Sequence, residues 1–333
     1  MSLELVKQFI INKNNFVIAT HYNPDADTIG SGLALYQALM SINKKAIVIN
    51  KDKTPKDCQF MPFINEVYNI DILRELNFKR EALIVVDCNS IKRISQETHH
   101  QALLSNLPSC VIDHHEISDV FGDIRWIEPP IASTTMMIYK LIKSLDIEIT
   151  KDIAICLYAG LCIDTGNFRH ENTSTESLKI ASDLVSKGIK PSKIYRELFE
   201  SWSSSKFKLF KEVIKGIEEQ NDIAIMTVTK DMLRDTGCDD DDAGNFVDFP
   251  KKTVYIKVSV LIKEISEDKY RISMRSKNGI NVAAVASQYN GGGHKNAAGC
   301  TIEGKIDDIK KDLFKKISDI MASPPTLKVV ENS

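Results

Sequence analysis

The 333-residue chain lacks the features of secreted, membrane-spanning and nucleic-acid-coating proteins. Its start, MSLELVKQFIINKNNF, has no basic stretch followed by an apolar one, so we predict no secretory signal. No apolar run approaches the ~18 residues that a membrane span needs. The 43 basic and 45 acidic residues give a net charge of −2. This balance argues against a coat for long nucleic acids but leaves room for a local basic groove.

The chain also has no pair of cysteines spaced C-x-x-C, and its seven cysteines are odd in number and scattered. In a chain without a secretory signal, this pattern predicts reduced, mostly buried thiols. Together these absences predict a soluble, cytoplasmic protein with no membrane partner.

Short apolar runs alternate with helical patterns in the first half of the chain. This alternation predicts an α/β fold whose N-terminal part is a doubly wound, mainly parallel sheet with helices on both faces. The predicted strands are 16–20, 46–50, 82–87, 110–113 and 124–127, and the predicted helices between them include 31–42 and 133–145.

The second half turns helical from residue 153 to 220 and then resembles a smaller C-terminal α+β domain. We expect a strand at 223–228, a hairpin of 254–265 with 270–275, a helix at 282–288, a glycine-rich turn and a final helix. The expected domains are 1–187 and 221–322, joined by a helical linker at 188–220, and residues 323–333 are expected to form a disordered tail.

Acidic and histidine side chains gather where predicted strands end, which is where parallel sheets bind ligands. They stand in HYNPDAD (21–27), LIVVDCNS, SCVIDHHE and AGLCIDTGNFRH. Singly, each acid is explained as well by a helix cap or a turn. A calcium loop fails because Thr28 and Ala34 occupy its sixth and twelfth positions, and no Gly-Lys-Ser/Thr follows Gly30 and Gly32 to make a phosphate loop.

Four carboxylates converging on one sheet edge would raise one another's pKa unless cations neutralised them. The four negative charges balance two divalent cations. A donor set rich in oxygen and poor in nitrogen suits manganese or magnesium better than zinc. Two metals ~3.5–4 Å apart are a recurrent device for attacking phosphate esters.

These four motifs, in this order, resemble the DHH phosphoesterase superfamily. The segment MRSKNGINVAAVASQYNGGGHKNAAGC, residues 274–300, resembles its DHH-associated domain. The GGGHKNAAG core is similar to that of small stand-alone nanoRNases that also hydrolyse pAp, and of enzymes that cleave cyclic dinucleotides or their linear products. The resemblance covers nearly the whole chain.

The resemblance implies a two-metal site with named ligands and catalytic residues. One Mn²⁺ would be bound by His21, Asp25 and Asp87, and the other by Asp27, Asp87, His114 and Asp164, so that Asp87 bridges the pair. Asp113 would orient a neighbouring imidazole and His115 would face the substrate phosphate. Asp87, Asp113 and His115 are therefore the expected catalytic residues.

The triglycine Gly291-Gly292-Gly293 allows backbone N–H groups to approach an anion, and a helix-like AxxA stretch follows it. An ordinary flexible turn explains it equally well. Arg275, at a predicted strand end, could hold a phosphate bidentately. The resemblance makes Arg275, the three glycines and His294 substrate-binding residues that face the metals across an interdomain cleft.

We therefore expect a manganese-dependent phosphoesterase, with magnesium as an option, that hydrolyses short oligonucleotides and pApA to mononucleotides by two-metal-activated attack of water. A 3′-phosphatase activity on pAp is expected beside it. The alternatives are a cyclic di-AMP phosphodiesterase and a catalytically silent nucleotide-binding regulator. We expect no long duplex as partner, and a homodimer stays open.

The pair His99-His100 falls in a polar segment. We expect a surface helix there, without a metal.

Overall fold

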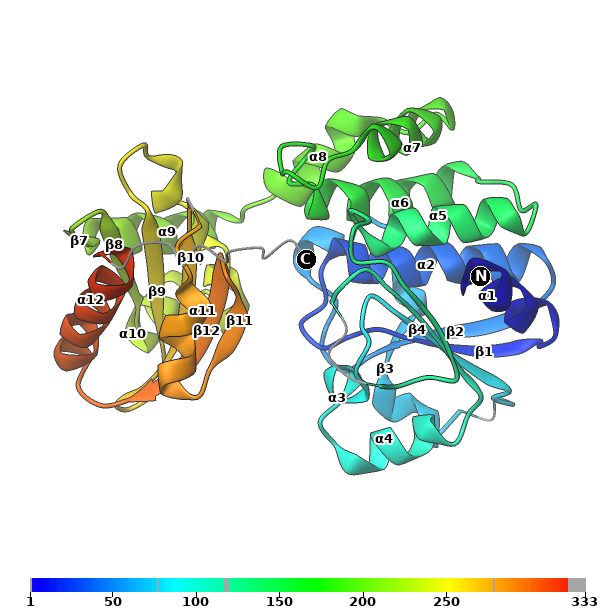
Figure 1. Ribbon diagram of the computed structural model, residues 1–333, viewed down its shortest axis with the longest axis horizontal. Coiled ribbons are helices and arrows are strands. Elements are labelled where there is room, and N and C mark those ends of the chain that lie inside the picture. The colour runs from blue at the N-terminus through cyan, green and yellow to red at the C-terminus, as the bar shows by residue number, and fades with distance from the viewer. Residues whose placement is uncertain (1, 77, 117–119, 278, 323–333) are drawn as a thin grey trace, which may run out of the picture. The chain divides into compact units, whose positions relative to one another are not determined.

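The computed structural model describes residues 2–322 except 77, 117–119 and 278 (Figure 1). The chain forms two compact units, of which unit 1 ends at Ser201 and unit 2 begins at Trp202. The expected fold class is confirmed, because a parallel sheet with helices is followed by a unit with a second, mixed sheet. The expected domain limits stay a prediction, and the expected tail, 323–333, lies outside the described residues.

The sheet of unit 1 is parallel and has the order β3-β2-β1-β4-β5-β6. Its strands are β1 (Asn15–Ala19), β2 (Lys45–Asn50), β3 (Val67–Asn69), β4 (Ala82–Val86), β5 (Ser109–Asp113) and β6 (Ile124–Ile127). The sequence did not predict β3, which is only three residues long. The direction of winding reverses between β1 and β4, so the carboxyl ends of these two strands flank the switch point where such sheets bind ligands.

Helices cover both faces of this sheet (Figure 1). The α-helices of unit 1 are α1 (Ser2–Ile11), α2 (Ala26–Ser41), α3 (Ile91–Ile94), α4 (Thr98–Ser105), α5 (Thr134–Ser144), α6 (Lys151–Asp164), α7 (Thr175–Ser186) and α8 (Pro191–Phe199). Its 3₁₀ helices are η1 (Lys56–Cys58), η2 (Ile64–Glu66) and η3 (Ile70–Arg74). Alternate strand residues enter different cores, as Ile18 does with α2, α5 and α6, and Val17 with α3 and α4. Burial on both faces explains why the strands are apolar without interruption.

Helix α2 begins at Ala26, five residues earlier than the sequence predicted. Asp25 caps it, because one carboxylate oxygen accepts the N–H groups of Asp27 and Thr28 at 2.9 and 3.0 Å. Gly30 and Gly32 therefore lie inside the helix, on faces that other elements approach closely. A Cβ at Gly30 would lie 2.4 Å from the Cys156 carbonyl oxygen of α6.

Unit 2 is built on a sheet of order β11-β12-β10-β9-β8-β7, in which only the pair β8 and β9 runs parallel among the described strands. Its strands are β7 (Glu218–Gln220), β8 (Ile223–Val228), β9 (Val258–Ser266), β10 (Lys269–Ser276), β11 (Gly292–His294) and β12 (Ala297–Glu303). Its helices are α9 (Ser204–Lys215), α10 (Lys230–Thr236), η4 (Asp240–Ala243), η5 (Phe246–Asp248), η6 (Pro250–Lys252), α11 (Val282–Ala286), η7 (Ser287–Tyr289) and α12 (Ile306–Ala322). Helices α11 and α12 pack on one core of this unit, and α9 and α10 on another.

Two expectations for unit 2 are wrong. The first strand of the hairpin begins at Val258 instead of residue 254, and Val254 itself is exposed. The stretch after the triglycine is strand β12 and not a helix, so no helix N-terminus follows the glycines. Gly293 has φ +139°, and a Cβ there would lie 2.5 Å from the Ala297 carbonyl oxygen. The tight β11–β12 hairpin thus explains this glycine without any ligand.

The expectation of unpaired, mostly buried cysteines is confirmed. All seven cysteines are free, and six of them are buried. Among the described residues, no helix combines the length and apolar character that crossing a membrane requires.

Replacing Gly30 by Ala tests the close approach of α2 to α6. Both Gly30→Ala and Gly32→Ala gain helix propensity, but the new methyl of Gly30→Ala meets a backbone carbonyl, whereas that of Gly32→Ala meets side-chain methyl groups of Val48 and Thr20 at 3.2 and 3.4 Å. We expect Gly30→Ala to lower the free energy of unfolding by about 1–3 kcal/mol relative to Gly32→Ala, as overpacked cores do. Urea unfolding of both variants measures this difference, and equal stabilities would contradict it.

Candidate metal-dependent active site

The candidate site lies at the carboxyl edge of the unit 1 sheet, at the switch point between β1 and β4. His21 follows β1, Asp87 follows β4, and Asp113 is the last residue of β5. The loop after β1 is held from the neighbouring strand, because the Asn50 side chain donates to the His21 carbonyl oxygen at 2.7 Å. The topology therefore brings together residues that are up to 92 positions apart in sequence.

Asp87 is buried in the centre of this edge, with 2% of its surface exposed. Its φ of +62° is left-handed, a conformation that aspartate tolerates better than most residues and that turns the chain directly after β4. The hydroxyls of Thr28 and Thr134 donate to its two carboxylate oxygens at 2.6 and 2.9 Å. The Nε2 atom of His21 lies 3.3 Å from one of these oxygens.

Asp27 is fully buried and is held by the N-terminus of α5. The backbone N–H groups of Thr134 and Thr135 donate to its two oxygens at 2.7 and 2.9 Å, and the Thr135 hydroxyl adds a bond of 2.7 Å. A helix N-terminus presents free N–H groups and the positive end of the helix dipole, so it stabilises this charge. Neither threonine was predicted as part of the site. The sequence Ser-Thr-Thr is typical of a helix start, but no neighbouring residue indicates that these threonines bind Asp27, more than a hundred residues earlier.

Three groups of side chains at this edge could each hold a metal ion, with ligand atoms within 4.8 Å of one another. The groups are His21, Asp25 and Asp87; Asp27, His114 and Asp164; and Asp87, His114 and His115. The Nε2 atom of His114 is central, at 3.1 Å from Asp164, 3.6 Å from Asp87 and 4.0 Å from Asp27. The expected ligands are thus neighbours in space, while their division between two ions stays a prediction.

The electrostatics of this group are those of crowded carboxylates. Burial raises the pKa of Asp27 well above its usual value, and the charges of Asp164 and Asp87 raise it further. Burial also raises the pKa of Asp164. Asp87 is the exception: burial acts in the same direction, but the hydrogen bond and charge of His21 together with the charges of His114 and His115 outweigh it and lower the pKa. Positive charge among these groups would relieve the repulsion.

The residues present fit a pair of divalent cations. Oδ2 of Asp164 is buried and has no hydrogen-bond partner among the described residues, although the His114 ring lies 3.1 Å from it. An unsatisfied carboxylate oxygen beside further carboxylates is a natural ligand for a hard cation.

Asp113 holds His115 rather than joining the metal-capable groups. One oxygen of the buried Asp113 carboxylate lies 2.8 Å from Nδ1 of His115 and accepts the His115 backbone N–H at 3.1 Å. The Asn89 side chain, which the sequence analysis did not single out, donates to the other oxygen at 2.7 Å. The carboxylate is therefore fixed at both ends and fixes the imidazole in turn.

The predicted substrate-binding residues of unit 2 lie on its strands β10 and β11 and, in the case of Gly291, directly before β11. Arg275, near the end of β10, is about one-third exposed. Its guanidinium donates to the Met274 carbonyl oxygen at 3.1 Å, and its Nε lies 3.8 Å from Asp248. Neither contact is a bidentate ion pair, so the guanidinium keeps donors for a ligand. Substrate binding by Arg275, Gly291, Gly292, Gly293 and His294 stays a prediction.

The fold is that of a two-unit α/β protein, in which a unit with a parallel sheet is followed by a unit with a mixed sheet. Its candidate metal site consists of buried carboxylates and imidazoles at the switch point of the parallel sheet. Residues 15–161 match the DHH family, N-terminal domain, and residues 220–322 match the DHHA1 domain. The chain belongs to the DHH phosphoesterase family and is thus a hydrolase acting on phosphoester bonds.

Relatives of known name cover most of the chain. It is 31% identical to the bifunctional oligoribonuclease and PAP phosphatase NrnA of Thermus thermophilus, over 86% of this chain and 84% of that protein. It is 26% identical to the protein of the same name from Bacillus subtilis, over 91% and 93% of the two chains. A crystal structure of an exopolyphosphatase-related protein from Bacteroides fragilis superposes with a TM-score of 0.89 at 28% identity, covering 96% of each chain.

Removing the Thr135 hydroxyl tests whether the N-terminus of α5 prepares Asp27 for a cation. In Thr135→Val the side chain keeps its shape but loses its bond to Asp27. We expect the affinity for Mn²⁺ to fall roughly 10–100-fold, as it does when groups that orient metal ligands are removed. Isothermal titration with Mn²⁺ measures the change. Ser31→Ala is the control, because the Ser31 hydroxyl is also buried but has no hydrogen-bond partner in the part of the chain that the structure describes. If both variants bind Mn²⁺ alike, the interpretation is wrong.

Proposed function

We propose that this protein hydrolyses short oligonucleotides and dinucleotides such as pApA to mononucleotides, and removes the 3′-phosphate of pAp, with two divalent cations as cofactors. Manganese is the favoured ion and magnesium the alternative. The observation that carries the proposal is the gathering of all six expected ligands at the switch point of the unit 1 sheet. The names of the two NrnA relatives support the choice of substrates.

The cations would be held in two places that share Asp87. His21 and Asp25 would complete one ligand set, and Asp27, His114 and Asp164 the other. When bound, two such ions supply a water of lowered pKa and positive charge against the phosphoryl oxygens. The hydroxyls and N–H groups that hold Asp27 and Asp87 would keep these carboxylates in place during the reaction.

His115 would contact the reacting phosphate. Its Nδ1 atom is engaged by Asp113, which leaves Nε2 of the ring for the substrate, and the side chain is 29% exposed. The Asp113 carboxylate fixes the orientation of the ring, so that Nε2 of His115 would face the phosphorus-bound oxygens on which negative charge develops. Asp113 acts here as a positioning residue.

Incubating the purified protein and Mn²⁺ with pAp, pApA, a five-mer RNA, a twenty-mer DNA and cyclic di-AMP tests this proposal. We expect cleavage of the five-mer, pApA and pAp, with the twenty-mer and cyclic di-AMP as the poorest substrates. Removing a group that merely orients a metal ligand lowers activity roughly 10–100-fold. We expect Asp87→Asn to lower the rate of hydrolysis by more than this, because Asp87 is proposed to bridge both ions. Asp152→Asn, an exposed acid at the start of α6, is the matched control.

The pattern of cleavage across these substrates distinguishes the candidate functions. Preferred cleavage of cyclic di-AMP would make the protein a cyclic-dinucleotide phosphodiesterase. Tight nucleotide binding without any cleavage would make it a silent regulator. If Asp87→Asn hydrolyses the substrates at nearly the wild-type rate, Asp87 does not bridge two ions.

Arg275 provides a second test, directed at unit 2. We expect Arg275→Ala to raise KM for pApA while leaving the Mn²⁺ content unchanged, because the guanidinium is proposed to bind a substrate phosphate and no cation. Arg271→Ala removes the same charge from the same strand at an exposed position and should leave KM unchanged. A loss of bound Mn²⁺ in Arg275→Ala, or equal KM values for the two variants, would contradict the assignment.

A further inference from the structure

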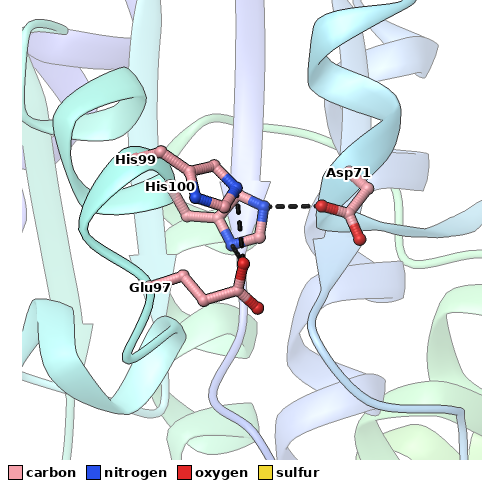
Figure 2. A group of neighbouring side chains, drawn as sticks. All are labelled: Asp71, Glu97, His99 and His100. Carbon is pink, nitrogen blue, oxygen red and sulfur yellow. Dashed lines mark hydrogen bonds and ion pairs between the residues drawn. The ribbon is translucent and has the colours of Figure 1, made fainter.

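A second group of histidines and acids shares no residue with the metal-capable groups described above. Figure 2 shows Asp71 from η3 together with Glu97, His99 and His100 at the start of α4. The Nε2 atom of His99 and the Nδ1 atom of His100 approach the same oxygen, Oε2 of Glu97, at 3.4 and 3.8 Å. Two imidazole nitrogens and one carboxylate oxygen thus converge on one point.

These separations are close to what a tetrahedral ion requires. With ligands at ~2.0–2.1 Å, a tetrahedral zinc ion holds its ligand atoms ~3.4 Å apart. The His99–Glu97 distance already has this value, and the His100–Glu97 distance exceeds it by a few tenths of an ångström. Small side-chain rotations would therefore bring both nitrogens to the distance from Oε2 that such an ion requires, and all the ligand atoms already lie within 4.8 Å of one another.

The second nitrogen of His100 is oriented as in known metal sites. Its Nε2 lies 2.7 Å from Oδ1 of Asp71, which fixes the proton on Nε2 and directs the lone pair of Nδ1 toward Glu97. Metal-bound histidines commonly donate their other N–H to a carboxylate in this way. The Ser95 hydroxyl, 3.0 Å from Nδ1, currently occupies that lone pair and would have to turn away. The expected surface position is wrong for His100, which is fully buried.

His99 supplies the independent observation. Its Nε2 atom is buried and has no hydrogen-bond partner among the described residues. The imidazole as a whole is 39% exposed, and this nitrogen faces a carboxylate oxygen of Glu97, which has lone pairs of its own, at 3.4 Å. In the neutral ring with its proton on Nδ1, both atoms are acceptors, so a cation between them would satisfy both.

The local charge permits a divalent cation. Lys51 contacts Glu97 at its other oxygen, Oε1, and lies 3.9 Å from Asp71. Oε2 of Glu97 is therefore left to the two histidines. Two carboxylates and one ammonium group leave a net charge of −1 before an ion binds.

We propose that His99, His100 and Glu97 form a second metal site, selective for zinc, in which Asp71 orients His100 and a water occupies the fourth position. Two imidazoles and one carboxylate suit zinc, in contrast to the oxygen-rich donors at the catalytic edge. All three ligands lie within residues 97–100, so the ion would fix the start of helix α4, and Asp71 of η3 would be joined to it through His100.

The test measures zinc in protein that already holds Mn²⁺. The wild type and the variants His99→Ala, Glu97→Gln and Glu75→Gln are equilibrated with excess Mn²⁺ and a small excess of Zn²⁺, passed through a desalting column and analysed for both elements. Glu75 is an exposed acid just after η3 and is the matched control for loss of charge. We expect the wild type and Glu75→Gln to hold one more zinc per chain than His99→Ala and Glu97→Gln.

Two further measurements keep the result independent of catalysis. Zinc should raise the Tm of the wild type and Glu75→Gln more than that of the other two variants. Hydrolysis by His99→Ala with Mn²⁺ should equal that of the wild type, because His99 lies outside the catalytic groups. Equal zinc content in all four folded proteins, as judged by circular dichroism, would overturn the proposal, and so would a zinc loss that appears only together with a loss of Mn²⁺.

Discussion

The stabilisation of buried negative charge at the carboxyl edge of the parallel sheet is the constraint on which unit 1 depends. Asp27 and Asp87 are 0% and 2% exposed, in surroundings where an unpaired carboxylate is strongly unfavourable. The N-terminus of α5 and three threonine hydroxyls supply donors to them. This requirement explains why polar residues such as Thr28 and Thr134 stand fully buried beside an otherwise apolar core.

The packing of α2 against α6 serves the same edge. A Cβ at Gly160 of α6 would lie 2.7 Å from an Asp27 carboxylate oxygen, and a Cβ at Gly30 of α2 would meet the backbone of α6. The two glycines therefore let the helices approach closely at this point. Since Asp164 is the last residue of α6, the same approach brings its carboxylate to the other acids. Core packing therefore determines the geometry of the site, because a shift of α2 would move Asp27 and a shift of α6 would move Asp164.

The sequence allowed the main strands and the acids at their ends to be predicted, because both are local signals with a topological consequence. Parallel strands share one carboxyl edge, so acids that follow several strands must meet. The start of α2 was placed too late, at residue 31, whereas Asp25 caps the helix and its first residue is Ala26. Strand β3 was missed since its three residues are only partly buried and make no apolar run.

Contacts over long sequence distances account for what could not be predicted. Thr134 and Thr135 carry no local sign that their partner is Asp27, 107 and 108 residues earlier. The group that approaches Gly293 is the backbone of β12, which accounts for that glycine, while substrate binding by the triglycine stays a prediction. A glycine-rich pattern indicates that something comes close, and only the fold shows what it is.

The two His-His pairs have the same residue types but different surroundings, so residue type alone does not predict which ion a site would bind. His114-His115 follows β5 at the switch point and meets carboxylates delivered by other strands and helices. His99-His100 belongs to a helix, and its carboxylates come from the residue before that helix and from η3. Both pairs lie beside acids, yet the first is crowded by several buried carboxylates, while the second has Lys51 to balance part of its charge. The surplus of negative charge, rather than the presence of histidine, therefore separates an oxygen-rich site for hard cations from the nitrogen-rich site proposed for zinc.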